Sequence, residues 1–333
     1  MILLFLIVAL AVVLLIAGFE MFLVLGVPAL LIKQFFYGSL PDPVVVQKIL
    51  GGINHSTLLA IPFFILAAEL MGEGQIARRL TSLVQSLLGH RKGGIGYTIV
   101  GGSMAFGSVS GSAPATVAAM GRLVYPEMRK AGFSDKFSLG LIASSAETAL
   151  LIPTSITFII YGWMTGTSVA RLFVAGMAVG LVLGLVFAIM VAIEARRAGV
   201  AAGERTSWGE RLRAVAHSGW ALGMPAIILG GIYSGVFTPT EAAAVSVVYA
   251  IFVEMVVFRE LTLKKLFKVT ERAAVSTAII FILLALGGLL SYFITLAQIP
   301  GQILEFLAAV DAGPIVFLLV VNVLLLVLGC LLE

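Results

Sequence analysis

The stretch MAFGSVSGSAPATVAAMG, residues 104–121, interrupts one of the most apolar parts of the chain with small, polar and helix-breaking residues. Its centre is GSVSGS, residues 107–112. Hydrocarbon cannot hydrogen-bond the backbone groups that such a sequence leaves free. A turn here must therefore be buried in protein or line a water-filled cavity if it lies inside a membrane.

Composition places the chain in the membrane class. Of 333 residues, 60% are hydrophobic and 11% are charged, and the mean hydropathy is +1.13. These values exclude an ordinary soluble domain and indicate a polytopic membrane protein. The net charge of +4 comes from Lys and Arg residues between apolar segments, without a continuous basic stripe, so no nucleic-acid partner is expected. The single cysteine, Cys330, supplies neither an internal disulfide nor a metal cluster.

Charge and length together predict that the opening stretch is the tip of a re-entrant hairpin. Residues 93–107 follow a basic cluster at 91–92, and 15 residues of helix reach only about 22 Å, short of a hydrocarbon core of about 30 Å. Residues 111–126 then return toward a second basic cluster at 129–130. Basic clusters mark the cytoplasmic side, so both limbs start and end there. Two short spans with an outer loop, or a close-packed G-x-x-x-G seam, are the alternatives.

The next apolar segment, residues 142–161, is predicted to be a broken helix. Pro153 lacks a backbone donor and disfavours helical geometry at Ile152. The two half-helices then present free carbonyls, which suit a small cation, and free amides, which suit an anion. A proline kink that serves packing alone is the alternative.

The second half of the chain repeats this order from the opposite face. Residues 274–297 start from a basic cytoplasmic cluster, and residues 298–313 contain no Lys or Arg, so residues 314–332 enter from the outer side. Short amphipathic pieces at 76–88 and 301–310 precede the two hairpins. This order predicts an all-α polytopic membrane protein with inverted repeats, re-entrant hairpins and broken helices, as in secondary transporters.

The predicted organisation has six parts, which are listed here in chain order. They are 1–55, N-terminal scaffold helices; 56–88, an arm helix and amphipathic segment; 89–165, a transport-domain half with its hairpin tip at 107–112 and broken helix at 142–161; 166–258, scaffold helices with a cytoplasmic linker at 194–217; 259–310, a second arm; and 311–333, the first limb of a second hairpin.

Four segments carry a family resemblance over nearly the whole chain. They are LLAIPFFILAAELM (58–71), SGSAPATVAAMGRLVYPEMRKAGF (110–133), YGWMTGTSVARLFVAGMAVG (161–180) and GGIYSGVFTPTEAAAVSVVYA (230–250). The chain resembles the large membrane subunit of tripartite ATP-independent periplasmic (TRAP) transporters. The last segment is the most specific, because its Gly-Gly-Ile-Tyr and Phe-Thr-Pro-Thr-Glu-Ala strings do not follow from hydropathy.

The resemblance implies a function in the bacterial inner (cytoplasmic) membrane. It implies sodium-driven uptake of a small carboxylate, with Na⁺ as coupling ion and no cofactor. The carboxylate is delivered by a periplasmic binding protein, and the large subunit forms a complex with a small four-helix membrane subunit. It also implies an elevator mechanism, in which a hairpin-bearing transport domain moves against a scaffold.

Sodium is a hard cation that takes about five or six oxygens, which carbonyls at a helix break and hydroxyls can supply. The expected ion site draws on both interruptions of the 89–165 half: Ser108, Ser110, Gly111, Ser112, Ser145, Thr148, Pro153 and Thr154. A substrate carboxylate is expected beside Ser112, Ala113 and Thr116, where amides at the start of the second limb point toward it. Glu147, a carboxylate near the broken helix, is assigned to the same substrate site, with a bound cation, a proton or a structural partner as alternatives.

Two departures from the family pattern matter, the first for substrate or ion preference and the second for whether the chain transports at all. SSAETALLIPTS, residues 144–155, stands where the family usually has a Gly-rich stretch and Ile-Pro-Pro-Ser, so Thr154 replaces a proline. The family also continues beyond a motif like NVLLLVLGCLLE (322–333), so we expect a fragment or a truncated reading frame. A non-transporting scaffold or degenerate subunit is the main alternative function, and a channel is another. An enzyme is not expected, because His55, His90 and His217 lie in or beside loops and no nucleophile elbow, zinc motif or phosphate loop is present.

Overall fold

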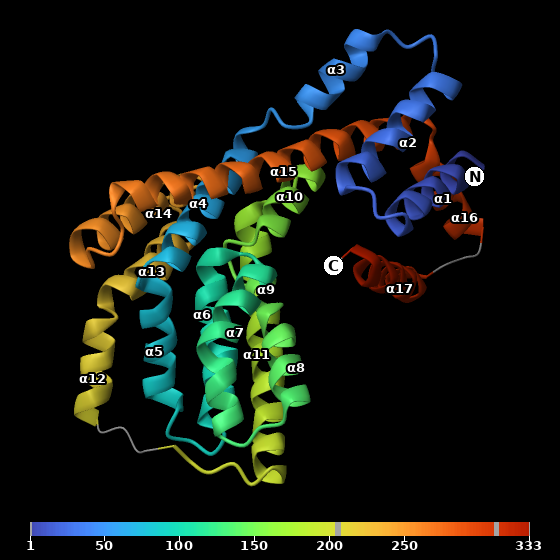
Figure 1. Ribbon diagram of the computed structural model, residues 1–333. Coiled ribbons are helices and arrows are strands. Elements are labelled where there is room, and N and C mark those ends of the chain that lie inside the picture. Colours follow the sequence, from blue (N-terminus) through green and yellow to red (C-terminus); the bar gives the residue numbers. More distant parts are fainter. Residues whose placement is uncertain (1, 204–207, 310–312, 333) are drawn as a thin grey trace. The chain divides into compact units, whose positions relative to one another are not determined.

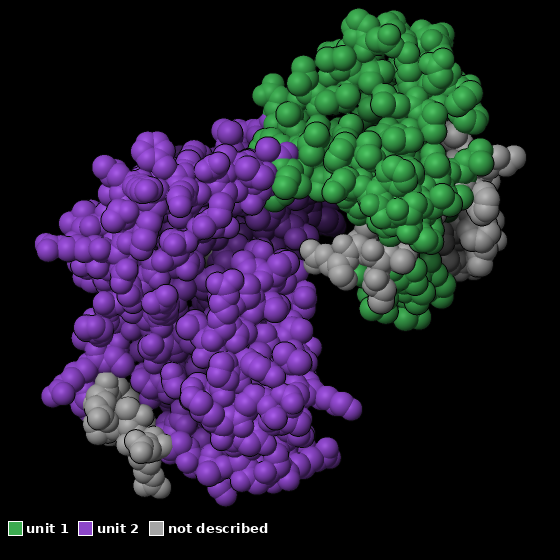
Figure 2. Space-filling model, in the orientation of Figure 1, with its two compact units in different colours: residues 1–54, 279–333 green, residues 55–278 purple. Residues whose placement is uncertain are grey.

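The computed structural model describes residues 2–203, 208–309 and 313–332, and within these ranges it is built of helices without strands. One isolated bridge pairs Lys92 with Ala202. The chain divides into two compact units, residues 1–54 with 279–333 and residues 55–278 (Figure 2). Each unit has its own elements and its own core.

Four helical segments in the described ranges are long and apolar enough to cross a bilayer: Ser56–Glu73, Val169–Arg197, Pro239–Val257 and Leu263–Leu296. A fifth span is formed if Asp135–Leu151 and Ile156–Thr165, which meet at an angle of 41°, are taken together. The prediction of an all-α polytopic membrane protein is confirmed.

The first unit contains helices from both ends of the chain. Its elements are α1 (Ile2–Ile16), α2 (Met21–Phe36), α3 (Asp42–Gly51), the end of α15 (Leu263–Leu296), α16 (Ile299–Ala309) and α17 (Pro314–Leu332). Ala29 and Ile32 of α2 are buried against Leu289 and Phe293 of α15. Tyr37 stacks on Phe293 with ring centroids 5.7 Å apart. Helices that are distant in sequence therefore share this core.

The second unit holds most of the chain. Its elements are η1 (Ser56–Leu59), α4 (Ala60–Glu73), α5 (Ile76–Leu88), α6 (Gly94–Ser110), α7 (Ala113–Lys130), α8 (Asp135–Ala146), α9 (Thr148–Leu151), α10 (Ile156–Thr165), α11 (Val169–Arg197), α12 (Trp208–His217), α13 (Gly219–Tyr233), α14 (Pro239–Phe252), the π-helical turn η2 (Val253–Val257) and the start of α15.

Three helices of this unit, α6, α7 and α11, run side by side (Figure 1). Ile99 of α6, Met120 of α7 and Val191 of α11 are fully buried in one apolar cluster. On the other flank α5 packs against α6, and α4 packs against α14. The hairpin of α6 and α7 therefore has packed helices on both sides.

α15 begins before the apolar stretch that the sequence shows. The apolar stretch begins at residue 274, and the basic residues before it were assigned to a cluster between apolar segments. The helix begins at Leu263, so Lys264, Lys268 and Arg272 are part of it. Lys and Arg have high helix propensity, so the helix continues past the apolar segment.

Candidate functional site

The hairpin turns at Gly111 and Ser112, within the predicted tip. α6 ends at Ser110, and Gly111 follows with φ 57° in the left-handed region, where glycine meets no Cβ penalty. Ser112 is extended, and its hydroxyl accepts a hydrogen bond from the Ala115 amide at 3.4 Å, which caps α7. Two residues therefore reverse the chain direction between two helices.

The polar groups of the turn bond to one another. Thr116 is fully buried, and its hydroxyl donates to the Ser112 carbonyl at 2.8 Å and lies 3.3 Å from the Ser110 Oγ. The Gly111 amide donates to the Gly107 carbonyl at 3.0 Å. These bonds satisfy backbone groups that hydrocarbon could not satisfy.

The next helix is interrupted over residues 152–155, the helix break. Ile152 is extended (φ −80°, ψ 143°), as expected before a proline, and α10 begins at Ile156. The Ser155 hydroxyl caps α10 by accepting from the Phe158 amide at 3.4 Å. Thr154 has φ 101°, a conformation that L residues rarely adopt.

The hairpin tip and the helix break lie against each other. A Cβ added at Gly111 would stand 2.4 Å from the Thr154 carbonyl oxygen. A Cβ added at Gly107 would stand 2.5 Å from the Ala149 Cα. The two backbones approach this closely only because both positions are glycine. This juxtaposition of two helix interruptions is the candidate functional site.

The structure brings some of the predicted ion-site residues together. The hydroxyls of others already donate hydrogen bonds within their own helices. Gly111 contacts Thr154, and Pro153 is buried beside them. The Ser108 hydroxyl donates to the Ala105 carbonyl at 2.8 Å, and the Thr148 hydroxyl donates to the Ser145 carbonyl at 2.6 Å. Such bonds within one helix are the ordinary state of buried hydroxyls.

Thr154 has a different environment from these hydroxyls. It is fully buried, and its Oγ1 has no hydrogen-bond partner among the residues that the structure describes. A buried hydroxyl without a partner costs free energy, and each such group in a native structure calls for an explanation. Of the predicted ion-site hydroxyls, that of Thr154 is the one that makes no hydrogen bond in the described ranges.

The predicted substrate residues differ in accessibility. Ser112 is half-buried, whereas Ala113 and Thr116 are buried inside the hairpin. Glu147 is exposed and stands between α8 and α9, two residue positions from the buried Ser145. Ser112 and Glu147 are therefore the two of this set that are not buried in the protein.

Two buried serines next to this site are not among the predicted site residues. Ser103 is fully buried, and its Oγ lies 3.2 Å from the Ser145 Oγ, which joins α6 to α8. Ser155 is fully buried in the helix break. The signal for Ser103 was its spacing, because positions 103 and 107 are four residues apart and share one helix face.

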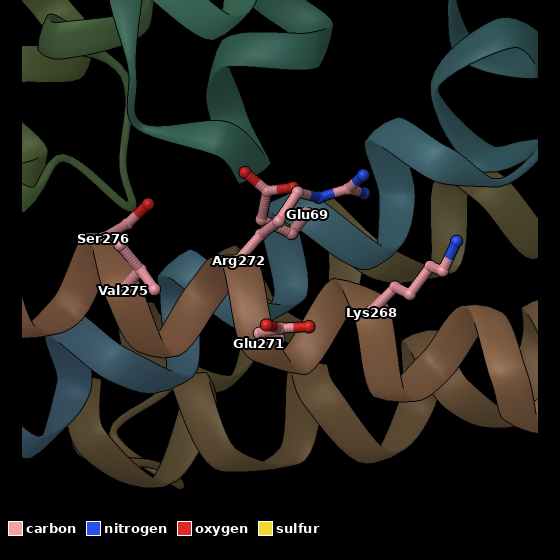
Figure 3. Close-up of a pocket in the computed structure, with 6 residues that line it drawn as sticks. All are labelled: Glu69, Lys268, Glu271, Arg272, Val275 and Ser276. Atoms are coloured by element: carbon pink, nitrogen blue, oxygen red, sulfur yellow. The ribbon is translucent and has the colours of Figure 1, made fainter.

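Apart from this site, a polar cavity of about 570 Å³ lies on α4 and α15. Figure 3 shows the Glu69 carboxylate beside the Arg272 guanidinium, with Lys268 and Ser276 further along α15 on either side. Arg272 pairs with Glu69 (Nε to Oε2, 3.3 Å) and with Glu73 (Nη2 to Oε2, 2.7 Å). Through these two ion pairs, Arg272 joins α15 to α4.

Comparison with known proteins extends over the whole chain. The family model described as "Tripartite ATP-independent periplasmic transporter, DctM component" matches residues 2–333. The ectoine TRAP transporter large permease protein TeaC of Halomonas elongata is 44% identical over 302 residues, covering 90% of this chain and 71% of the relative.

Two further relatives have similar coverage. The ectoine/5-hydroxyectoine TRAP transporter large permease protein UehC of Ruegeria pomeroyi is 42% identical over 94% of this chain and 73% of its own length. The C4-dicarboxylate TRAP transporter large permease protein DctM of Pseudomonas aeruginosa is 39% identical over 88% of this chain and 69% of its own length.

Proposed function

Because this chain belongs to the DctM family of TRAP transporters, as a large permease protein, we propose that it takes up a small carboxylate with sodium as coupling ion. The chain is a multi-pass membrane protein. Its relatives are transporter permeases and not enzymes.

One observation carries the sodium proposal, namely the contact between the hairpin tip and the helix break. Gly111 and the Thr154 carbonyl meet there, and the unpartnered Thr154 Oγ1 lies at the same place. Carbonyls at a broken helix together with hydroxyls form a neutral oxygen environment, which suits a monovalent hard cation. Thr154 is the residue on which the proposed ion site depends most.

The substrate proposal depends on the start of α7. The positive end of a helix attracts anions, and α7 starts after the half-buried Ser112. Pro114 has no backbone N–H, and the Ala115 and Thr116 amides donate to Ser112, so the Ala113 amide is the one proposed to meet the carboxylate. Two of the relatives are named for ectoine and one for C4-dicarboxylates, and these solutes share a carboxylate group. Ectoine, which also carries a cationic ring, is the first substrate to test. The exposed Glu147 is the candidate to meet that positive charge.

The remaining parts of the proposal come from the family. A periplasmic binding protein delivers the solute, a small four-helix membrane subunit accompanies the chain, and the complex lies in the bacterial inner membrane. Residues 89–165, which carry the hairpin tip and the helix break, move as an elevator domain against the scaffold.

Uptake by reconstituted protein tests this function. The chain is placed in liposomes with its small subunit, and binding protein loaded with labelled ectoine is added outside under an inward Na⁺ or K⁺ gradient. Uptake is expected only with Na⁺. Uptake that is equal in both gradients would indicate an uncoupled channel, and no uptake of any carboxylate would favour a non-transporting scaffold.

A variant pair tests the ion site. Thr154→Val removes the unpartnered hydroxyl and keeps the side-chain shape, so we expect the Na⁺ concentration for half-maximal uptake to rise at least tenfold. Thr270→Val is the matched control, because the exposed Thr270 hydroxyl donates to the Leu266 carbonyl of its own helix at 2.9 Å. Equal sodium dependence of the two variants would contradict the proposed ion site.

A further inference from the structure

Glu254 is a fully buried carboxylate outside the candidate functional site. It lies in η2, where α14 passes into a π-helical turn, and its side chain has no exposed surface. The sequence shows it only as one acid inside an apolar run. A buried charge is retained only when hydrogen bonds or opposite charges compensate it, so its partners define what it does.

Those partners are backbone amides of another helix. The Gln75 amide donates to Glu254 Oε1 at 2.8 Å and to Oε2 at 2.9 Å, and the Ile76 amide donates to Oε1 at 2.8 Å. The first amides of a helix have no acceptor within that helix. Glu254 therefore caps α5 from a distance of 178 positions in the sequence.

The cap lies at the two-residue connection between α4 and α5, which we call the hinge. α4 ends at Glu73 and α5 begins at Ile76, so Gly74 and Gln75 connect them. A Cβ added at Gly74 would stand 2.0 Å from the Glu254 carboxyl carbon. The carboxylate reaches the amides of the hinge only because residue 74 has no side chain.

The other end of Glu254 is fixed as well. The Phe258 amide donates to the Val253 carbonyl at 2.8 Å, closing the π turn, and the Glu260 amide donates to the Glu254 carbonyl at 3.0 Å. The Arg79 guanidinium, one turn into α5, lies 4.0 Å from the centre of the Phe258 ring. π turns of this kind redirect single side chains and are frequent at functional positions.

From this hinge a direct contact leads to the hairpin. α5 packs along α6, and a Cβ added at Gly101 of α6 would stand 2.7 Å from Val84 Cγ1 of α5 (Figure 1). Ser110, the last residue of α6, adjoins the hairpin tip. The orientation of α5 therefore constrains the limb that carries the tip.

We propose that Glu254 is a positioning residue, whose carboxylate holds the α4–α5 hinge in one orientation and thereby sets the position of α6. Its effect on solute uptake rests on the proposed transport function. Its effect on the hinge does not, so the two can be tested separately.

The hinge is tested in the full chain with its small subunit in nanodiscs. Nitroxide labels are attached at Gln85→Cys on α5 and Val248→Cys on α14, both exposed positions, in a Cys330→Ser background that removes the only native cysteine. Distances are measured by double electron–electron resonance. Glu254→Gln replaces one acceptor oxygen with an NH₂ group that cannot accept from an amide.

The matched control is Glu260→Gln. Glu260 Oε1 accepts from the Gln75 side-chain nitrogen at 2.7 Å, so it contacts the same residue but is exposed. We expect one narrow distance population in the parent and in Glu260→Gln, and a shifted or broadened population in Glu254→Gln. Gly74→Ala, which displaces the carboxylate from the opposite side, is expected to give the same change.

Uptake provides the second readout. Glu254→Gln should lower the maximal uptake rate at least tenfold without changing the half-saturating concentration of loaded binding protein, and Glu254→Asp should restore part of the rate.

Unchanged distances in both Glu254→Gln and Gly74→Ala would overturn the proposal. If Glu254→Gln does not fold, Gly74→Ala alone decides. If the parent protein shows no uptake, the proposed function fails while the distance measurement still decides whether Glu254 holds the hinge.

Discussion

At the scale of single residues, Thr154 has the least favourable backbone conformation near the candidate site. A non-glycine residue at φ 101° costs about 1–3 kcal/mol. Thr154→Gly is therefore expected to raise the unfolding midpoint in detergent, by an amount equivalent to about 1 kcal/mol after the greater freedom of glycine in the unfolded chain is subtracted. Thr154→Pro should lower it, because proline fixes φ near −65°.

This prediction bears on the family pattern. The family resemblance implies Ile-Pro-Pro-Ser at this place, and a proline cannot adopt the φ that Thr154 has. A Thr154→Pro variant that is as stable as the parent would show that the helix break can take the family's geometry without cost.

Gly111 gives a prediction of the opposite sign. Gly111→Ala would place a Cβ 2.4 Å from the Thr154 carbonyl oxygen and would keep a left-handed φ of 57°. We expect a loss of about 2 kcal/mol or more, measured as the change in unfolding midpoint. Gly121→Ala on α7 is the matched control, because a Cβ there meets nothing within 4 Å. It should gain about 0.5–1 kcal/mol, since glycine is a poor residue inside a helix.

At the scale of elements, the start of α14 offers a local test. The Thr238 hydroxyl accepts from the Glu241 amide at 3.3 Å, and the Glu241 carboxylate accepts from the Thr238 amide at 2.8 Å, which is a capping box. Thr238→Ala should cost about 1 kcal/mol of unfolding free energy. Glu241→Gln keeps an acceptor oxygen and should cost less. A Thr240→Ala control removes only a 3.4 Å bond to the Ser56 carbonyl, so a loss as large as that of Thr238→Ala would contradict the cap.

The elements that could be predicted are those whose cause lies in neighbouring residues. α6 ends at Ser110 inside the predicted tip of 107–112, and α9 ends before Pro153. Gly, Ser and Pro act on their own backbone, so their positions in the sequence indicate where helices stop. The membrane class followed from composition, and the all-α fold followed from the order of apolar segments and basic clusters.

Features that depend on distant contacts were not predictable in this way. Glu254 is one acid in an apolar run. Its role as a cap of α5 depends on amides 178 and 179 positions away. The positive φ of Thr154 depends on how the helix break packs against the hairpin tip, and the engaged hydroxyls of Ser108 and Thr148 depend on side-chain rotamers. The assignment of these residues to a sodium site stays a prediction.

At the scale of the whole molecule, membrane topology can be measured with single cysteines in the Cys330→Ser background. Ser134→Cys, beside the basic end of α7, should react with an impermeant maleimide only after cells are opened, because basic clusters stay in the cytoplasm. Thr167→Cys, between α10 and α11, should react in intact spheroplasts.

A third cysteine separates the re-entrant hairpin from two short spans. Ser112→Cys at the tip should be shielded from the outside reagent if the tip is enclosed by protein. If α6 and α7 instead cross the bilayer, residue 112 lies in an outer loop and labels as fast as residue 167. That result would overturn the re-entrant topology.

The first unit combines segments from both ends of the chain, and this has a consequence for biosynthesis. Ala29 and Ile32 complete their core with Leu289 and Phe293, and all of residues 55–278, which belong to the other unit, are translated in between. At bacterial elongation rates that interval is on the order of tens of seconds. During this time α2 lacks its native neighbour, and lipid or an insertase must cover the surface of α2 that α15 later covers. Helices made before the second unit therefore acquire their native neighbours only after that unit has been made.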